Sequence, residues 1–322
     1  MEYNNLPGTG LKVSKLSLGT MMFGGQTAEA EALSIMDYCY ERGLNFWDTA
    51  DVYNAGESER IVGRALKGRR DDIILATKVF YPFGDKLNNR GLNRRHIVES
   101  IEGSLRRLGT GYIDIYYMHA PDYETSLEET LDTLSCLVRS GKVRYLGVSN
   151  FASWQIADIL GLCELKGFVK PVISQNIYNL LLRDVEQELL PCLAAHGMGM
   201  AVYNPVAGGF LTGKYRNRDL GINTRFANQK NYVDRYWSEA NFAVLEKFEA
   251  IAKGQGLSLL ELALRWCINR LSVNTLISGV SRLEQIKQNI AALESSVLAP
   301  EAAAACDEAW SAMAGKRFAY NR

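Results

Sequence analysis

The chain has 322 residues, of which 47% are hydrophobic, and its 36 lysines and arginines balance its 36 aspartates and glutamates. That length is normal for one α/β barrel, and a chain of this size can bury a large apolar core. The lack of net charge argues against a nucleic-acid-binding or membrane-surface protein, so any recognition of an anionic ligand must be local.

Short apolar runs alternate with longer amphipathic segments along the chain. Residues 3–14, with Pro7-Gly8 and Gly10 at their centre, predict a β-hairpin. Eight runs of strand length follow: Leu16–Leu18, Leu44–Trp47, Ile73–Ala76, Ile113–Met118, Tyr145–Val148, Val172–Ser174, Met198–Val202 and Thr275–Ile277. Segments with apolar residues three and four apart predict helices between them, among them Thr27–Arg42, Arg94–Leu108, Ser126–Ser140, Ala152–Lys166 and Glu186–Ala195.

This alternation predicts βα units and therefore a parallel sheet. Eight units favour a closed (β/α)8 barrel over an open doubly wound sheet. The first run leads into Gly19-Thr-Met-Met-Phe-Gly24-Gly25, which is not the GxGxxG pattern that usually follows the first strand of an open dinucleotide-binding sheet. We therefore expect one α/β barrel domain over residues 1–322, with the hairpin ahead of it.

Two long connections and the end of the chain complete the predicted organisation. The connections are Phe80–Asn93, after the third run, and Pro205–Tyr236, after the seventh. The second has little apolar periodicity and is expected to be a long loop, and loops of that length are usually functional or mobile. Residues Pro300–Arg322 predict a helix followed by a tail.

The six cysteines include no CxxC pair, so we expect small apolar core residues rather than a metal site or a disulfide framework. The N-terminus lacks a signal-peptide pattern, and no apolar run is long enough to span a membrane. These features predict a cytoplasmic protein without a nucleic-acid or membrane partner. They leave the oligomeric state open.

Four reactive side chains follow three successive strand runs. Asp48 and Tyr53 follow the second run, Lys78 the third and His119 the fourth. Active sites of α/β barrels lie at the carboxyl ends of the strands, so we expect these side chains to meet on one rim. Each residue alone has an ordinary explanation: a helix cap for Asp48, a rim aromatic for Tyr53, a solvated cation for Lys78 and a buried histidine for His119. Their joint occurrence favours a catalytic group.

This combination suits the reduction of a carbonyl, which requires a hydride on carbon and a proton on oxygen. Tyr53 can donate the proton, and Lys78 can lower the phenol's pKa by stabilising the phenolate. Asp48 can orient Lys78, and His119 can donate a hydrogen bond to the carbonyl oxygen. A cofactor would carry the hydride, and no metal is needed.

A second candidate site follows the eighth run. A helix is predicted to begin near Leu283, and helix N-termini bind anions through free N–H groups and the helix dipole. Ser281 and Arg282 lie at that start, while Gln285 and Asn289 share a helix face with Ser281. Ser281 taken alone is equally well explained as a helix cap. Because a guanidinium suits phosphate, Arg282 favours a 2′-phosphate and hence NADPH over NADH.

The sequence closely resembles the aldo-keto reductase superfamily over nearly its whole length. The matching motifs occur in the family's order and spacing: Asp48-Thr-Ala-Asp-Val-Tyr53, Thr77-Lys78, Met118-His-Ala-Pro-Asp122, Gly147-Val-Ser-Asn-Phe151, Gln175-Asn176, Gly209-Phe-Leu-Thr-Gly-Lys214 and Gly279-Val-Ser-Arg-Leu-Glu-Gln-Ile-Lys-Gln-Asn289.

The resemblance implies a (β/α)8 barrel, an NADPH/NADP+ cofactor and a catalytic tetrad of Asp48, Tyr53, Lys78 and His119. It implies that Ser149, Asn150 and Gln175 bind the nicotinamide carboxamide and that Tyr203 stacks on the nicotinamide ring. It assigns the remaining cofactor contacts to three groups: Gly19 and Thr20 near the nicotinamide and its ribose; Asn204, Pro205, Leu211, Gly213 and Lys214 in the cofactor-covering segment; and Gly279, Ser281, Arg282, Gln285 and Asn289 near the adenosine phosphate.

The predicted function is the NADPH-dependent reduction of an aldehyde or ketone, a small-molecule carbonyl such as a sugar or a xenobiotic. Candidate walls of the substrate pocket, which equally suit simple packing, are Phe23, Trp47, Phe80, Tyr81 and Tyr232. Two alternatives stay open. The enzyme would act as an alcohol or sugar dehydrogenase if its physiological direction is oxidation. The chain would instead be a nicotinamide-sensing module if it resembles the family's channel-associated members, although no feature marks a channel partner.

Overall fold

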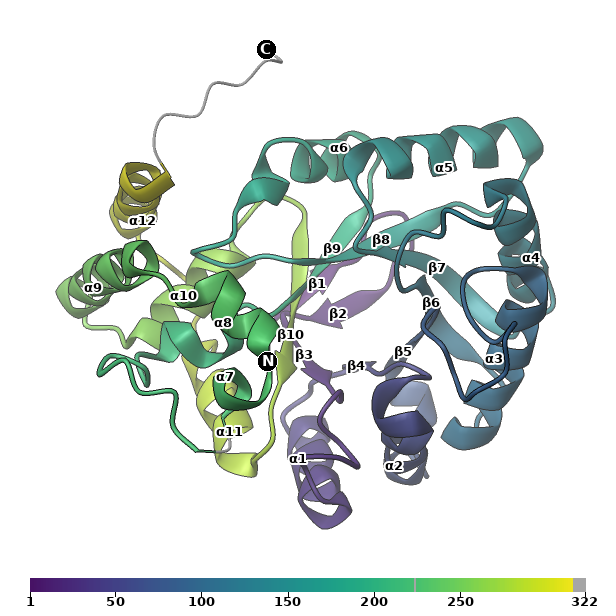
Figure 1. Cartoon of the computed structure of the whole chain (residues 1–322), viewed down its shortest axis with the longest axis horizontal. Helices are drawn as coiled ribbons and strands as arrows, with labels where there is room; N and C mark the ends of the chain where they lie inside the picture. The colour runs from purple at the N-terminus through teal and green to yellow at the C-terminus, as the bar shows by residue number, and fades with distance from the viewer. Residues whose placement is uncertain (223, 315–322) are drawn as a thin grey trace.

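The computed structural model describes residues 1–222 and 224–314, and eight parallel strands of that part close into a barrel (Figure 1). The barrel strands are β3 (Leu16–Gly19), β4 (Phe46–Asp48), β5 (Ile74–Val79), β6 (Ile113–Met118), β7 (Val143–Ser149), β8 (Pro171–Ile177), β9 (Gly199–Tyr203) and β10 (Val273–Gly279). Neighbours in sequence are neighbours in the barrel, and β10 closes it against β3. The predicted (β/α)8 barrel is confirmed.

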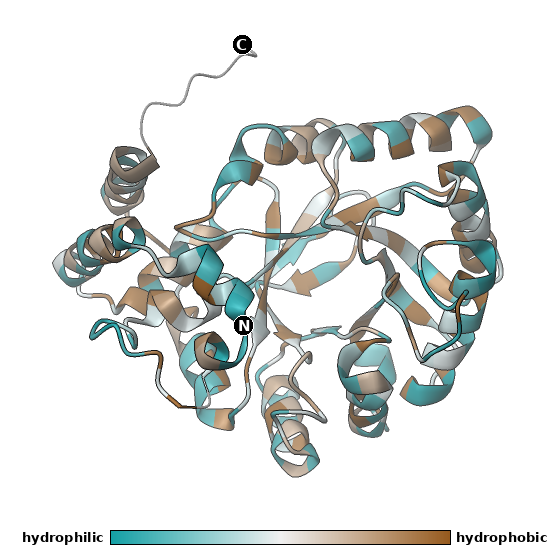
Figure 2. Ribbon diagram, viewed as in Figure 1, coloured by the Kyte–Doolittle hydropathy of each residue, from teal (hydrophilic) through white to brown (hydrophobic). Residues whose placement is uncertain are grey.

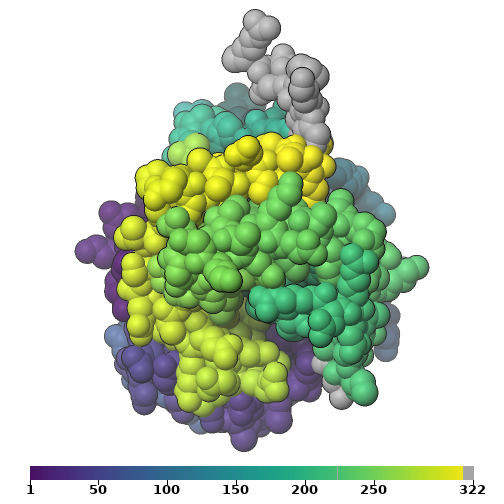
Figure 3. Space-filling model, turned by 90° about the vertical axis from the view of Figure 1, so that its left-hand side faces the viewer, coloured from purple at the N-terminus to yellow at the C-terminus, as the bar shows by residue number. Residues whose placement is uncertain are grey.

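Helices surround the barrel and carry both apolar and polar residues, as expected for helices with one buried side (Figure 2). They are α1 (Glu29–Glu41), α2 (Glu57–Ala65), α3 (Arg94–Leu108), α4 (Leu127–Arg139), α5 (Ser153–Lys166), α6 (Leu189–Ala195), α9 (Glu239–Gly254), α10 (Leu259–Ile268), α11 (Leu283–Ala292) and α12 (Pro300–Ala314). The last of these packs across α9 on the outside of the molecule (Figure 3). The tail predicted after α12 lies outside the described residues.

A two-stranded hairpin closes one end of the barrel. Strands β1 (Tyr3–Asn5) and β2 (Lys12–Ser14) pair antiparallel, as predicted. Leu6 and Val13 are buried against residues that point into the barrel, among them Phe46 and Ile115. Because Leu6 packs beside Gly199 at the start of β9, the hairpin covers the amino ends of the strands. The opposite, carboxyl end therefore remains for a site.

The connection after β9 is more ordered than its sequence suggested. It contains a 3-10 turn (Ala207–Thr212) and two short helices, α7 (Arg225–Asn228) and α8 (Lys230–Tyr236). Aromatic rings pack on one another along it; Tyr215 and Phe226, for example, have centroids 4.6 Å apart. The predicted long connection between β9 and α9 is present, and the short helices within it were not predicted. Irregular aromatic packing stabilises this segment, and such packing leaves no periodic signal in the sequence.

Candidate active site

The four predicted catalytic residues meet at the carboxyl end of three neighbouring strands. Asp48 is the last residue of β4, and Lys78 lies one residue before the end of β5, which runs three residues further than predicted. His119 directly follows β6. Tyr53 begins a short 3-10 turn after β4. Parallel pairing of β4 with β5 and of β5 with β6 places these strand ends side by side.

Lys78 lies at the centre of the group and is fully buried. Its ammonium donates to Asp48 Oδ1 at 2.5 Å, to the backbone oxygen of Thr49 at 2.7 Å and to Tyr53 Oη at 3.3 Å. These three contacts use all three protons of the ammonium. The other oxygen of Asp48 accepts from Gln175 Nε2 at 2.7 Å. The ammonium is thereby fixed against the Tyr53 hydroxyl.

The electrostatics of Tyr53 differ in net direction from the prediction. Burial raises the pKa of the Tyr53 phenol, and the nearby Lys78 ammonium opposes that shift without cancelling it. The predicted effect of Lys78 therefore has the right sign, but the phenol stays protonated at neutral pH. Burial also works against the charged form of Lys78, yet Asp48 and Tyr53 together outweigh it and raise the pKa of Lys78. The lysine is thus a permanent cation.

His119 is neutral at physiological pH. Burial, assisted by the Lys78 ammonium, holds the pKa of His119 well below its usual value. Its ring lies edge-on to Tyr53 and to Tyr81, with centroids 6.0 and 4.9 Å away. Its Nδ1 is buried and has no hydrogen-bond partner among the described residues. A neutral imidazole keeps one N–H, which can donate to a carbonyl oxygen.

An unusual turn holds Tyr53 in place. The two residues after it, Asn54 and Ala55, have positive φ angles of 48° and 54°. Such left-handed geometry is costly for an alanine and persists only where the surroundings enforce it. The Asn54 amide supplies that enforcement by donating to the backbone oxygens of Met21 and Phe23 at 2.9 and 2.8 Å. The turn is thereby tied to the loop that follows β3.

Three buried hydroxyls, of which the sequence singled out Thr20 alone, support the same strand ends. This hydroxyl cluster consists of Thr20, Thr49 and Ser58. Ser58 Oγ lies 2.8 Å from Thr20 Oγ1 and 2.9 Å from Thr49 Oγ1. Thr20 Oγ1 donates to the backbone oxygen of Asp48 at 3.0 Å. The Thr20 side chain, predicted to approach the cofactor, is thus fully buried and engaged with protein atoms.

The residues predicted to bind the carboxamide form a connected group beside His119. Asn150 has a positive φ of 64° and donates to the backbone oxygen of His119 at 3.0 Å and to Ser149 Oγ at 3.1 Å. Its oxygen accepts from the hydroxyl of Tyr203 at 2.8 Å. Tyr203, at the end of β9, is therefore linked across the rim to His119. Gln175 already donates one of its two amide protons to Asp48 Oδ2, so one amide proton is left for another partner.

Residues of the connection after β9 differ in their accessibility. The Asn204 amide donates to Tyr236 Oη at 2.8 Å, and Pro205 and Leu211 are buried. Gly213 has a positive φ of 76°, and Lys214 is exposed beside it. Of the predicted pyrophosphate contacts, the Lys214 ammonium thus remains available, whereas Gly213 is buried and its N–H donates to the backbone oxygen of Phe210 at 3.2 Å. The Leu211 side chain packs in the core and offers nothing to a pyrophosphate.

The second candidate site lies where β10 leads into α11. Gly279 ends β10 and pairs with Gly19 at the end of β3. Ser281 N donates to Gln285 Oε1 at 2.9 Å, and Asn289 Nδ2 donates to Ser278 Oγ at 2.8 Å. Arg282, the residue before α11, is exposed and has no ion-pair partner within residues 1–222 and 224–314. An unpaired guanidinium at a helix N-terminus fits a phosphate.

The candidate pocket walls divide into two kinds. Phe23 and Trp47 are fully buried in the core, where the Trp47 indole N–H donates to the backbone oxygen of Leu44 at 3.0 Å. They are packing residues, because no substrate can reach them. Tyr81 is 40% exposed and its ring lies against that of His119. Tyr81 is therefore accessible beside the tetrad.

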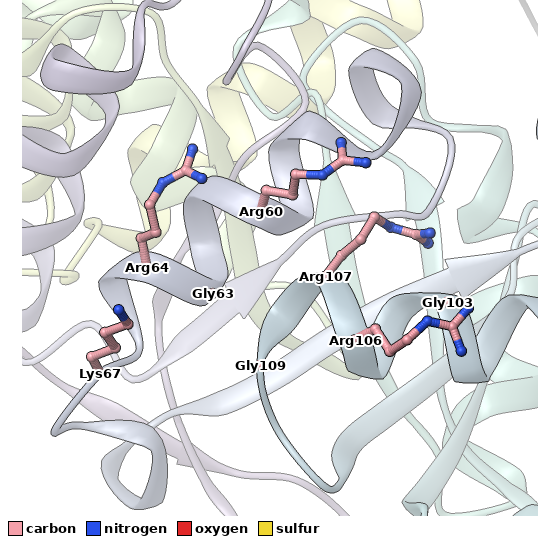
Figure 4. A pocket seen from close by; sticks show the side chains of 8 residues that line it. All are labelled: Arg60, Gly63, Arg64, Lys67, Gly103, Arg106, Arg107 and Gly109. Atoms are coloured by element: carbon pink, nitrogen blue, oxygen red, sulfur yellow. The ribbon is translucent and has the colours of Figure 1, made fainter.

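A shallow pocket with a volume of about 520 Å³ lies away from the tetrad, between α2 and α3, and is lined by basic side chains (Figure 4). Three of its cations have acidic partners: Arg60 pairs with Glu57, Arg64 with Glu57 and Glu29, and Arg107 with the buried Glu59. The side chains point in different directions rather than toward one point (Figure 4). The surface is on the outside of the barrel, so we assign the chemistry to the rim.

Other site types find no support in the part of the chain that the structure covers. Among its helices, none combines the length and the apolar character needed to cross a membrane. Among the same residues, no three histidine, cysteine or acidic side chains are grouped so that they could hold a metal ion. The six cysteines are all free thiols.

Comparison with known proteins assigns the chain to a family. The model of the aldo/keto reductase family matches residues 15–311. A probable voltage-gated potassium channel subunit beta from Arabidopsis thaliana is 38% identical over 91% of this chain and 92% of its own. The uncharacterized oxidoreductase YrpG from Bacillus subtilis is 38% identical over 92% of both chains. Aflatoxin B1 aldehyde reductase member 2 from Homo sapiens is 37% identical over 91% of this chain and 85% of its own. The chain therefore belongs to the aldo/keto reductase family.

Proposed function

We propose that this protein reduces an aldehyde or ketone to the alcohol with NADPH and that Tyr53 is the proton donor. The observation that carries the proposal is the contact between the Tyr53 hydroxyl and the buried Lys78 ammonium, at 3.3 Å. Asp48 neutralises the ammonium at 2.5 Å, so the charge is stable in a buried place. This arrangement stabilises a phenolate as it forms, which is what a phenolic acid requires.

Each residue of the tetrad then has a defined task. When bound, the cofactor supplies the hydride. Tyr53, protonated at neutral pH, donates its proton to the carbonyl oxygen, and Lys78 stabilises the phenolate that remains. Neutral His119 donates an N–H to the same oxygen and orients the carbonyl. Asp48 holds Lys78 in position.

The residues present suit a phosphorylated nicotinamide cofactor at both ends. At the tetrad end, Gly19 serves the packing of β3 against β10, because a side chain there would meet Ile277 Cγ2 at 2.7 Å. Ser149, Asn150 and Tyr203 offer polar groups and a ring there. At α11, Arg282 is the cation we assign to the 2′-phosphate, and Lys214 is the one we assign to the pyrophosphate.

A carbonyl panel tests the proposal directly. Purified protein is incubated with NADPH and a series of aldehydes and ketones, and NADPH absorbance is followed. We expect carbonyl-dependent loss of NADPH with at least one substrate class. The protein would not be a reductase if it quenches NADPH fluorescence, and so binds NADPH, but oxidises no NADPH with any carbonyl of the panel.

That second outcome would favour a nicotinamide-sensing module. The specific observation behind this alternative is that channel subunits and reductases match the chain with nearly equal identity, 38% and 37%. A third candidate, a dehydrogenase working toward the carbonyl, uses the same tetrad in reverse. It would show faster turnover with NADP+ and alcohols than with NADPH and carbonyls at neutral pH.

A further inference from the structure

The N-terminus of α11, where we assign the 2′-phosphate, already contacts an anion of the protein itself. The backbone N–H of Leu283 donates to Glu31 Oε1 at 2.6 Å. Glu31 lies in the first turn of α1, which packs beside α11 (Figure 1). Thr27, just before α1, donates to the backbone oxygen of Ser281 at 3.4 Å. The start of α1 thus adjoins the segment from Ser281 to Leu283.

Glu31 differs in its partners from the acidic residue two positions earlier. Glu29 forms an ion pair with Arg64 on α2. Glu31 has no basic partner within residues 1–222 and 224–314, and its contact there is the Leu283 N–H. It is half-buried, so water screens its charge only in part. A carboxylate and an unpaired guanidinium, Glu31 and Arg282, therefore flank the first residue of α11.

We propose that Glu31 sets the choice between NADH and NADPH, acting against Arg282. This inference rests on the cofactor site proposed above. A carboxylate repels a 2′-phosphate, whereas it can accept a hydrogen bond from the free 2′-hydroxyl of NADH. The guanidinium of Arg282 has the opposite preference. The two residues together make the site tolerant of both cofactors rather than strict for NADPH.

The test measures cofactor binding and does not depend on turnover. Dissociation constants for NADPH and NADH are determined by cofactor fluorescence for the wild type, Glu31→Gln, Arg282→Ala and the double variant. A glutamine retains an oxygen that can accept from Leu283 N, so we expect the fold to persist. Glu31→Gln should tighten NADPH binding by about tenfold at low salt and weaken NADH binding slightly. Arg282→Ala should weaken NADPH far more than NADH.

Glu29→Gln is the matched control, because it removes the same charge from the same helical turn but away from α11. It should leave both dissociation constants within about twofold, since exposed charges are largely screened. In 1 M salt, the gain from Glu31→Gln should shrink markedly.

The outcomes separate the two proposals. If the wild type binds neither nucleotide, the proposed function fails and this inference fails with it. If the wild type binds NADPH but Glu31→Gln changes both constants equally, or changes neither, the role of Glu31 is overturned while the proposed function stands. Weaker NADPH binding by Glu31→Gln would also overturn it, because Glu31 would then support the phosphate site rather than oppose it.

Discussion

Buried carboxyl groups near the tetrad have different partners, and those partners decide their charge. Asp48 faces the Lys78 ammonium and a Gln175 amide. Asp51, three residues later and fully buried, accepts one hydrogen bond from Ser100 at 2.7 Å, while its other oxygen has no partner among the described residues. Burial raises the pKa of Asp51 to about 7, and the nearby Glu59 adds to that shift. Burial raises the pKa of Asp48 as well, but the Lys78 ammonium and the Gln175 amide oppose that shift.

Asp51 therefore makes stability depend on pH. Its folded-state pKa exceeds its unfolded value, so the folded protein binds the extra proton between about pH 4 and pH 7, and stability falls as pH rises through that window. We expect Asp51→Asn to be more stable than the wild type at pH 8, by on the order of 1 kcal/mol or more, and equal to it at pH 4. Urea unfolding from pH 4 to 8 measures this. The exposed Asp158→Asn is the control, and a wild-type pH slope in Asp51→Asn would refute the assignment.

The tetrad could be located from the sequence, but its supports could not. Asp48, Tyr53, Lys78 and His119 follow strands, and barrel geometry places such residues on one rim. The bond from Gln175 to Asp48 joins positions 127 residues apart and depends on how the barrel closes. The net protonation of Tyr53 depends on burial, which the sequence did not show for that side chain.

Elements were predicted well where local signals mark their ends. Helix α3 has the predicted limits, because the Asn93 side chain accepts from His96 N at its start and Gly109 adopts a left-handed conformation at its end. Strand β5 was predicted too short, because Thr77 and Lys78 interrupt the apolar run although both are buried, Thr77 by its hydrogen bond to Glu59 and Lys78 by pairing with Asp48. The order of the 207–236 segment was missed because aromatic packing has no sequence period.

The hydroxyl cluster is the link between elements that we expect to matter most for catalysis. Thr49 supplies the backbone oxygen that holds Lys78, and its side chain is held by Ser58 of α2 at 2.9 Å. Thr49→Val keeps the shape but removes the hydroxyl. We expect turnover to fall about tenfold, because small displacements of catalytic groups are costly, while the dissociation constant for NADPH stays near the wild-type value. Thr49→Ser restores the hydroxyl and should restore turnover; equal losses in both variants would contradict this role.

At the scale of the whole molecule, one buried arginine joins the end of the chain to the barrel. Arg183, in the segment after β8, is 5% exposed and lies between the rings of Trp266 and Trp310, 4.7 and 4.6 Å from their centroids. It pairs with Glu186 and with Asp307 of α12, at 2.9 Å each. This contact connects α10, α12 and the β8 connection.

Replacing Arg183 should therefore loosen the attachment of α12. We expect Arg183→Met to lower the free energy of unfolding by about 2–3 kcal/mol, because it removes the buried cation that lies against two tryptophan rings and leaves Arg270 as the remaining cation for Glu186 and Asp307. Arg94→Met is the matched control, since Arg94 pairs with Asp132 in an exposed position. Its effect should stay below about 0.5 kcal/mol. Thermal unfolding of both variants measures these changes. Similar losses of unfolding free energy in the two variants would contradict the role assigned to Arg183.

The role of Tyr53 as proton donor is tested most directly by comparing NADPH binding with carbonyl reduction in Tyr53→Phe. The substitution removes one hydroxyl, the group that contacts Lys78 at 3.3 Å, and preserves the ring. NADPH binding is followed by fluorescence, and hydride transfer is followed in a single turnover with a carbonyl substrate. We predict a dissociation constant for NADPH within about threefold of the wild type and a reduction rate lowered by about a hundred- to ten-thousand-fold. A reduction rate close to that of the wild type would show that Tyr53 is not the proton donor.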